Sequence, residues 1–204
     1  MRKFLNLNKT DNAKLATKFG FLLRSNDECN KEDCCWAAIT IFDHWLHQSH
    51  SFHRIKEASA AQQSQWTDTI KQFLRALVQI EAPLKYRFKG RHSKQYLQFA
   101  RYVGNQEIGN YLANQFDDIY YPNVVFEQLG VELWFEDYWT LHFKYKNQHD
   151  CLPLLQLATE MGLYILPVSC ADNLNDYPQL SQFMRDHGLA KSLYRPVHVP
   201  TDIE

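Results

Sequence analysis

Two neighbouring cysteines stand at the start of a segment with helical spacing of apolar residues, where a thiol could act as a nucleophile. Cys34 and Cys35 follow Asp33, and Ile39 and Phe42 continue the apolar spacing. A thiol in the first turn of a helix faces the positive end of the helix dipole, which lowers its pKa and favours the thiolate. The pattern predicts either a nucleophile at Cys35 or a small core residue on the same apolar stripe.

The segment from Cys34 to Ala38 resembles the Cys-Trp-Ala signature around the nucleophile of papain-like cysteine peptidases. The resemblance covers about five residues of 204. It implies Cys35 as the nucleophile, His142 as the base and a later Asn or Asp as the orienting group. The chain departs from the family six residues before the nucleophile, where Cys29 replaces the glutamine of the oxyanion hole. A cysteine-dependent hydrolase or transferase is the alternative function that follows.

The charges are divided along the chain, although the formal net charge is only -1. Residues 82–101 carry six basic side chains and no acid, whereas residues 102–143 carry seven acids and neither Lys nor Arg. The acids alternate with tyrosines and tryptophans, a composition typical of surfaces that hold a cationic partner. The expected binding surface consists of Glu132, Trp134, Glu136, Asp137 and Tyr138.

The favoured function is therefore non-catalytic protein binding with a basic partner. By analogy of surface character, the chain would act like the bacterial immunity-type inhibitors that neutralise a basic toxin or nuclease. An acidic surface would raise the rate of association with such a partner. Complementary acidic and basic regions also leave a head-to-tail or symmetric oligomer open.

The basic run is a third candidate site, for RNA or single-stranded DNA. Its basic side chains are interleaved with Tyr86 and Phe88. Lys and Arg side chains neutralise phosphates, and aromatic rings stack on nucleobases. The sequence pI of about 6.7 lacks the overall basic character of a dedicated nucleic-acid binder, so an intramolecular match to the acidic region is the alternative. The residues concerned are Lys85, Arg87, Lys89, Arg91 and Lys94.

Histidines recur at every third residue from His44 to His53, and Asp43 with His47 forms the best pair for a metal ion. Successive steps of three residues wind around a helix by about 60°, so these histidines cannot all face one ion. The sequence also lacks a Walker loop, a dinucleotide-binding motif and a serine-hydrolase motif. We expect no metal and no cofactor.

Hydrophobic periodicity predicts the elements that position these residues. Helices are expected over residues 10–24, 33–46, 54–80, 93–103, 106–116, 152–161 and 177–187. Strands are expected over residues 164–168 and in two runs between 123 and 146, and residues 84–89 are expected to form either a half-buried strand or an exposed basic loop. A three-residue connection between those two runs pairs apolar with apolar side chains and sets Glu132 opposite His142.

The expected fold is α+β within a single domain over residues 1–204. An N-terminal helical part (about 1–118) precedes a mostly antiparallel sheet (β-β-α-β-α, about 119–204) that is covered by helices. A chain of 204 residues buries roughly 70% of the surface of its unfolded form, so it needs no disulfide to fold. The sequence has neither a secretion signal nor a membrane-spanning apolar run, so a cytoplasmic location, no membrane contact and free thiols are expected.

Overall fold

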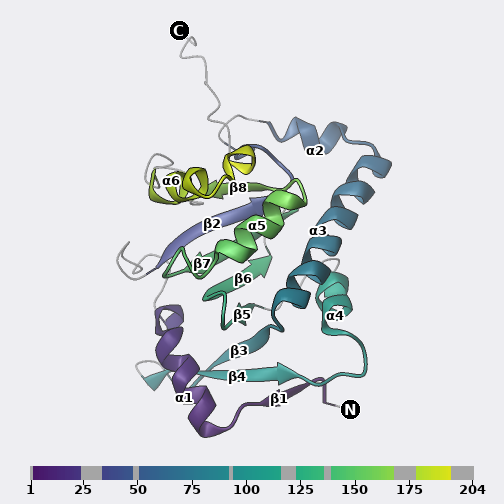
Figure 1. Cartoon of the computed structure of the whole chain (residues 1–204). Coiled ribbons are helices and arrows are strands. Elements are labelled where there is room, and N and C mark those ends of the chain that lie inside the picture. The colour runs from purple at the N-terminus through teal and green to yellow at the C-terminus, as the bar shows by residue number, and fades with distance from the viewer. Residues whose placement is uncertain are drawn as a thin grey trace.

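The computed structural model describes residues 2–23, 34–47, 51–91, 94–115, 123–135, 139–167 and 178–193. The strands are β1 (Phe4–Asn6), β2 (Cys35–Thr40), β3 (Leu84–Lys89), β4 (Tyr96–Tyr102), β5 (Val124–Phe126), β6 (Val131–Phe135), β7 (Thr140–Tyr145) and β8 (Tyr164–Pro167). Within the described ranges these eight strands form one antiparallel sheet in the order β1-β4-β3-β5-β6-β7-β2-β8. Figure 1 shows them stacked from β1 at the bottom to β8 at the top.

Helices accompany the sheet, so the predicted α+β class is confirmed. They are α1 (Lys9–Lys18), the 3-10 helix η1 (Gly20–Leu23), α2 (His53–Glu57), α3 (Ala60–Ile80), α4 (Ile108–Gln115), α5 (Leu152–Glu160), α6 (Pro178–Asp186) and the 3-10 helix η5 (Ala190–Ser192). In the part of the chain that the structure describes, none of these helices is both long and apolar enough to cross a lipid bilayer.

One side of the sheet, which we call the α3 face, packs against α3, α4, α5 and α6. Phe73 of α3 and Leu154 of α5 belong to the same buried apolar cluster as Leu133 and Phe143 of the sheet. Figure 1 shows α3 running beside the strands and α5 lying in front of them. Because side chains alternate along a strand, every second residue of β6 and β7 points into this core.

The opposite side of the sheet, the α1 face, has a smaller core. Leu15 of α1 and Leu22 of η1 pack there against Tyr86 and Phe99. Farther along this face Trp45 packs against β2 and β8. The middle of the sheet is therefore buried on both sides, and α1 and η1 cover only the part formed by β3, β4 and β5.

Two segments that were expected to be helices are strands. Residues 33–46 contain β2, and residues 93–103 contain β4. In β2, Ala37 packs on the α3 face and Ala38 on the α1 face, so both sides of the strand are apolar and the alternation that identifies a strand is absent. The N-terminal helical part (about 1–118) is not confirmed, since this region contributes β1, β2, β3 and β4 to the sheet.

The long predicted helix over residues 54–80 is divided into α2 and α3. The backbone is extended at Ala58 and Ser59, and the side chain of Ser59 caps α3 by accepting a hydrogen bond from the Gln62 amide over 3.2 Å. The predicted elements α1, α4, α5, β8 and α6 are present with shifted ends, and residues 84–89 form the strand β3 instead of an exposed loop.

The pairing of β6 with β7 differs by two residues from the predicted register. Glu132 lies opposite Lys144, and Trp134 rather than Glu132 lies opposite His142. A shift of two residues keeps each side chain on its face, so both registers place apolar opposite apolar side chains on the α3 face. Only the observed register also pairs the opposite charges of Glu132 and Lys144.

Asn12 of α1 closes part of the outer edge of β4. Its Nδ2 donates a hydrogen bond to the Leu97 carbonyl over 2.9 Å, and its Oδ1 accepts one from the Phe99 amide over 2.8 Å. The strand β1 pairs with β4 only from Ala100 to Tyr102. The Asn12 side chain therefore takes the place of a neighbouring strand just beyond the end of β1.

The turn between β5 and β6 ends at Gly130, which has a φ of 63°. A left-handed conformation costs other residues roughly 1–2 kcal/mol. A Cβ there would also lie 3.1 Å from the Asp150 carboxylate. Gly130→Ala should therefore lower the free energy of unfolding by about 1–2 kcal/mol in urea denaturation.

Gly20→Ala is the matched control, because its Cβ would meet no atom within 4 Å and its φ is not positive. It should change the free energy of unfolding by less than about 0.5 kcal/mol. Equal losses for Gly130→Ala and Gly20→Ala would contradict the assignment of strain to Gly130.

Candidate functional site

A polar cluster is buried in the α1 face between β3 and β7. Glu132 and Lys144 are cross-strand neighbours and are only 3% and 6% exposed. Tyr86 Oη donates a hydrogen bond to Glu132 Oε1. Asn123 Nδ2 donates to the same carboxylate oxygen over 3.3 Å and to Tyr86 Oη over 3.2 Å. Side chains from β3, β6 and β7, and from the residue before β5, therefore meet at one carboxylate.

Burial governs ionisation in this cluster. Desolvation raises the pKa of Glu132 above its usual value, against the hydrogen bond from Tyr86 and the positive charge of Lys144. Desolvation also lowers the pKa of Lys144, and the nearby Glu132 carboxylate opposes this change. Burial and the same carboxylate raise the pKa of Tyr86 far above its usual value, so Tyr86 keeps its proton and acts as the donor.

A pocket of about 230 Å³ opens beside this cluster. Perturbed ionisable groups that line a concave site are the usual mark of a functional centre. Phe88, which is 48% exposed, and the half-buried Trp134 add aromatic rings to the lining. The complete lining is Leu22, Tyr86, Phe88, Asn123, Glu132, Trp134 and Lys144.

Aromatic rings surround the charge of Lys144 on its other sides. Its Nζ lies 4.3 Å from the ring centre of Trp36 and 5.6 Å from that of Trp134. The two indoles meet edge to face, with 5.4 Å between their centres. Such cation–π contacts favour the charged ammonium form. His142 lies next in this row, with ring-centre distances of 5.3 Å to Trp134 and 5.9 Å to Trp45.

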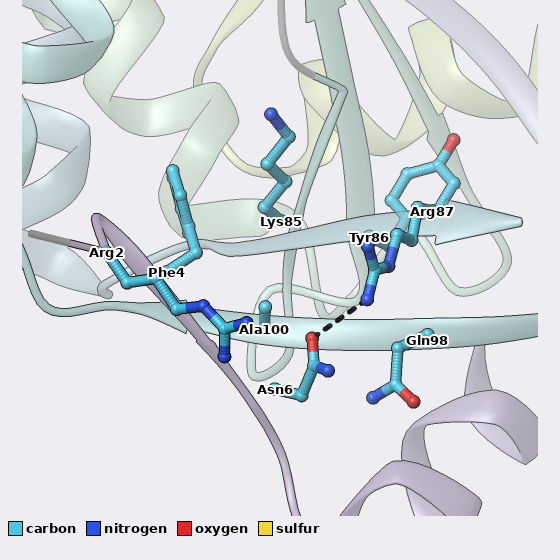
Figure 2. A pocket seen from close by; sticks show the side chains of 8 residues that line it. All are labelled: Arg2, Phe4, Asn6, Lys85, Tyr86, Arg87, Gln98 and Ala100. Atoms are coloured by element: carbon cyan, nitrogen blue, oxygen red, sulfur yellow. Dashed lines mark hydrogen bonds between the residues drawn. The ribbon is translucent and has the colours of Figure 1, made fainter.

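A second candidate site lies on the α3 face at the end of the sheet formed by β1, β4 and β3. The basic side chains of β3 alternate with Tyr86, which belongs to the α1-face core. The side chains of Lys85, Arg87 and Lys89 therefore project on the α3 side. Arg2 lines the same pocket as Lys85 and Arg87, and these three side chains are labelled in Figure 2. We call Arg2, Lys85, Arg87 and Lys89 the basic strip.

Figure 2 shows a pocket of about 220 Å³ along this strip. Arg87 points toward Asn6 of β1, and its Nη2 donates a hydrogen bond to Asn6 Oδ1 over 3.4 Å. The pocket lining is Arg2, Phe4, Asn6, Lys85, Tyr86, Arg87, Gln98 and Ala100. A neighbouring pocket of about 330 Å³ shares Arg2 and is lined by Arg2, Lys3, Tyr102, Gly104, Asn105 and Gln106. Neither described lining contains an acidic side chain, so both pockets favour anions.

Aromatic side chains accompany the strip. Lys85 Nζ lies 5.3 Å from the ring centre of Phe4. Tyr96 pairs with Lys89 across β3 and β4 and is 51% exposed. The remaining bases predicted for this site, Arg91 and Lys94, lie in the connection between β3 and β4.

The predicted acidic binding surface is only partly described. Glu132 is buried in the polar cluster, and Trp134 is half-buried beside the pocket. Glu136, Asp137 and Tyr138 lie outside the described residues. The surface therefore stays a prediction, and Glu132 contributes to the interior of the α1 face instead of a solvent-exposed acidic patch.

The structure does not bring the predicted nucleophile and base together. Cys35 is directly opposite Tyr145 and packs against the α3-face core. His142 is opposite Ala38 and contacts Trp45 on the α1 face. The two side chains project from opposite sides of the sheet. Because Cys35 begins a strand, the helix dipole that would have lowered its pKa is also absent.

The cysteines differ in state. The prediction of a free thiol is wrong for Cys34, which is disulfide-bonded. Cys35 and Cys151 are thiols. Burial raises the pKa of Cys151 to about 12, which makes it a poor nucleophile.

The histidine-rich segment forms no metal site in the part of the chain that is described, where no three ligating side chains gather. Asp43 accepts a hydrogen bond from Arg54 Nη1 over 3.0 Å and lies 2.9 Å from His44 Nδ1. Although burial raises the pKa of Asp43, its hydrogen bond with Arg54 and its electrostatic interactions with His44 and Arg54 hold that pKa below its usual value. His47 is exposed, and His50 lies outside the described residues.

Sequence reasoning missed Tyr86, Asn123, Lys144 and Trp36 as members of the site on the α1 face. A signal for two of the members was present, because Glu132 and Lys144 are single opposite charges within strands that are otherwise mainly apolar. A buried charge requires a partner. Tyr86 and Asn123 come from more distant segments, and no local pattern links them to Glu132.

Comparison of the chain with protein families, curated proteins and solved structures gives no significant match.

Removing one charge of the buried cluster should destabilise the protein. Lys144→Met leaves Glu132 without its cationic neighbour, and we expect a loss of roughly 1–3 kcal/mol in the free energy of unfolding. Glu132→Gln in the same chain should recover part of that loss. Urea denaturation of the four proteins of this double-mutant cycle gives the coupling energy. Additive losses would contradict electrostatic coupling between Glu132 and Lys144.

The raised pKa of Glu132 predicts a pH dependence of stability. The folded protein holds this proton more tightly than the unfolded chain does. The contribution of Glu132 is therefore fully present below the usual value of 4.5 and is lost as the pH rises through the raised pKa. Relative to the wild type, Glu132→Gln should gain stability as the pH rises from about 4 to 7. Denaturation at each pH measures this difference, which should stay flat for the exposed control Glu127→Gln.

Proposed function

We propose that the protein binds single-stranded nucleic acid on the α3 face, along the basic strip formed by Arg2 and β3. The observation that carries the proposal is the alternation of Lys85, Arg87 and Lys89 on one side of one strand. Alternate residues of a strand are about 6.6–6.8 Å apart. This spacing resembles that of successive phosphates along an extended strand of nucleic acid, so each basic side chain can contact a different phosphate.

The aromatic side chains at the strip support this class of ligand over other anions. Sheet surfaces that bind single strands combine basic side chains with rings on which bases stack. Phe4 beside Lys85 and the exposed Tyr96 beside Lys89 supply such rings at two positions along the strip. An acidic protein partner would contact the basic side chains but would gain less binding energy from these rings.

The charge distribution sets the expected strength of binding. The formal net charge is -1, so the strip is a local feature and not part of a wholly basic surface. We therefore expect modest affinity that falls steeply with salt. The protein-binding function predicted from the acidic region stays a separate hypothesis, and it has less support because Glu132 is buried.

Fluorescence anisotropy with a labelled single-stranded RNA at several salt concentrations tests the proposal. For single strands, the logarithm of the binding constant falls with the logarithm of the salt concentration by roughly 0.7 per phosphate neutralised. Replacing Lys85 and Arg87 by Gln should weaken binding and reduce this slope by about 1.4, since two contacts are lost.

Lys9→Gln with Lys14→Gln is the matched control, because it removes two exposed charges from α1, on the opposite face. It should leave the slope nearly unchanged. Equal effects of the two double variants, or equal competition by polyglutamate and by unlabelled RNA, would overturn the proposal. Equal affinity for duplex RNA would overturn the preference for single strands.

A further inference from the structure

The pocket on the α1 face presents a hydrogen-bond acceptor and a donor side by side. Glu132 and Lys144 both line it and are direct neighbours on β6 and β7. Within the described part of the chain, the hydrogen bonds from Tyr86 and Asn123 both go to Glu132 Oε1. The second carboxylate oxygen, Oε2, is therefore the atom of Glu132 that can serve a ligand.

Opposite charges at one site restrict the charge of the ligand. A cation that approaches Glu132 is repelled by Lys144, and an anion that approaches Lys144 is repelled by Glu132. A neutral group that carries a donor beside an acceptor can form hydrogen bonds with both side chains at once. A ligand whose polar group enters such a buried site without a hydrogen-bond partner is strongly disfavoured.

The shape and lining of the pocket restrict the ligand further. Its volume of about 230 Å³ is smaller than the roughly 300–1,000 Å³ of pockets for drug-sized molecules, so it suits a single or fused ring. The rings of Phe88 and Trp134 in the lining provide flat apolar surfaces for a planar ligand. This pocket lies on the face opposite the basic strip, so it is a separate site.

We propose that this pocket binds a neutral planar heterocycle whose edge carries an N–H group beside a C=O group, as in guanine. The N–H donates a hydrogen bond to Glu132 Oε2, and the carbonyl accepts one from Lys144 Nζ. Flat bases held in protein pockets are recognised in this way, by hydrogen bonds to one edge and contact with aromatic side chains.

Isothermal titration calorimetry with guanosine and 1-methylguanosine tests the proposal on the unmodified protein. Both nucleosides are free of phosphate, so the basic strip contributes little, and they differ in whether the ring nitrogen beside the carbonyl carries a hydrogen. We expect guanosine to bind and its methylated form to bind at least about tenfold more weakly, which corresponds to one lost hydrogen bond. Equal binding of the two, or no binding of guanosine at millimolar concentration, overturns the proposal.

A pair of variants locates the site. Glu132→Gln should weaken guanosine binding at least about tenfold, because the amide replaces a charged acceptor. Glu127→Gln, an exposed carboxylate outside the pocket lining, should leave the affinity unchanged. Circular dichroism shows whether each variant is folded, and the comparison of the two nucleosides on the unmodified protein holds even if Glu132→Gln is not.

A competition experiment distinguishes two possibilities: that the pocket binds a free small molecule, or that it holds a nucleobase of the bound RNA. Because the pocket and the basic strip lie on opposite faces, saturating guanosine should not displace labelled RNA from the protein. Displacement would overturn the independence of the two sites and assign the pocket to a base of the bound strand. If RNA fails to bind but guanosine binds selectively, the function proposed for the strip fails and this inference stands.

Discussion

The constraint on which the structure depends is the burial of the sheet's centre on both faces. On the α3 face the strands β5, β6 and β7 meet this constraint with apolar side chains, as in Leu133 and Phe143. On the α1 face the same strands carry Glu132 and Lys144. Because moving a lone charge out of water costs several kcal/mol, these two side chains have to be neighbours. Tyr86 and Asn123 complete the hydrogen bonding of the carboxylate, so one polar cluster couples β3 and β5 to the β6–β7 hairpin.

The strand β3 belongs to both candidate sites. Its alternation sends Tyr86 to the buried carboxylate on the α1 face and sends Lys85 and Arg87 to the open end of the α3 face. The hydrogen bond from Tyr86 thus adds a side-chain contact to the backbone pairing that holds β3 beside β4 and β5. Both candidate sites depend on this alternation, and they lie on opposite faces of the sheet.

The sequence predicts well those elements whose periodicity is unambiguous. The strict alternation over residues 84–89 left a strand and an exposed basic loop open, and the structure forms the strand, with its basic side chains on one face. The segment that contains β2 could not be assigned correctly, because a strand buried on both sides has no alternation, and its apolar residues also match the spacing of a helix. That error moved Cys35 from a strand to a helix start and suggested a partnership with His142 that the sheet prevents.

The register of β6 with β7 shows what pattern reasoning can add. Apolar pairing alone allowed two registers, and the choice between them decided whether Glu132 met His142 or Lys144. Adding the requirement that buried opposite charges pair selects the observed register from sequence. The hydrogen bonds from Tyr86 and Asn123 could not be foreseen in this way, since they depend on the order of β3, β5 and β6 across the sheet.

The outer strands of an open sheet are its weak point, because unpaired backbone groups there can recruit a strand from another molecule. Here β1 has three residues, and β8 has four and ends at Pro167, which has no amide hydrogen to donate. A bridge from Ile165 to Leu193 covers part of the β8 edge, and Asn12 occupies the backbone groups of Leu97 and Phe99 on β4. The Asn12 side chain thus occupies backbone groups of β4 that could otherwise pair with a strand of another molecule, at the place where β1 is too short to cover them.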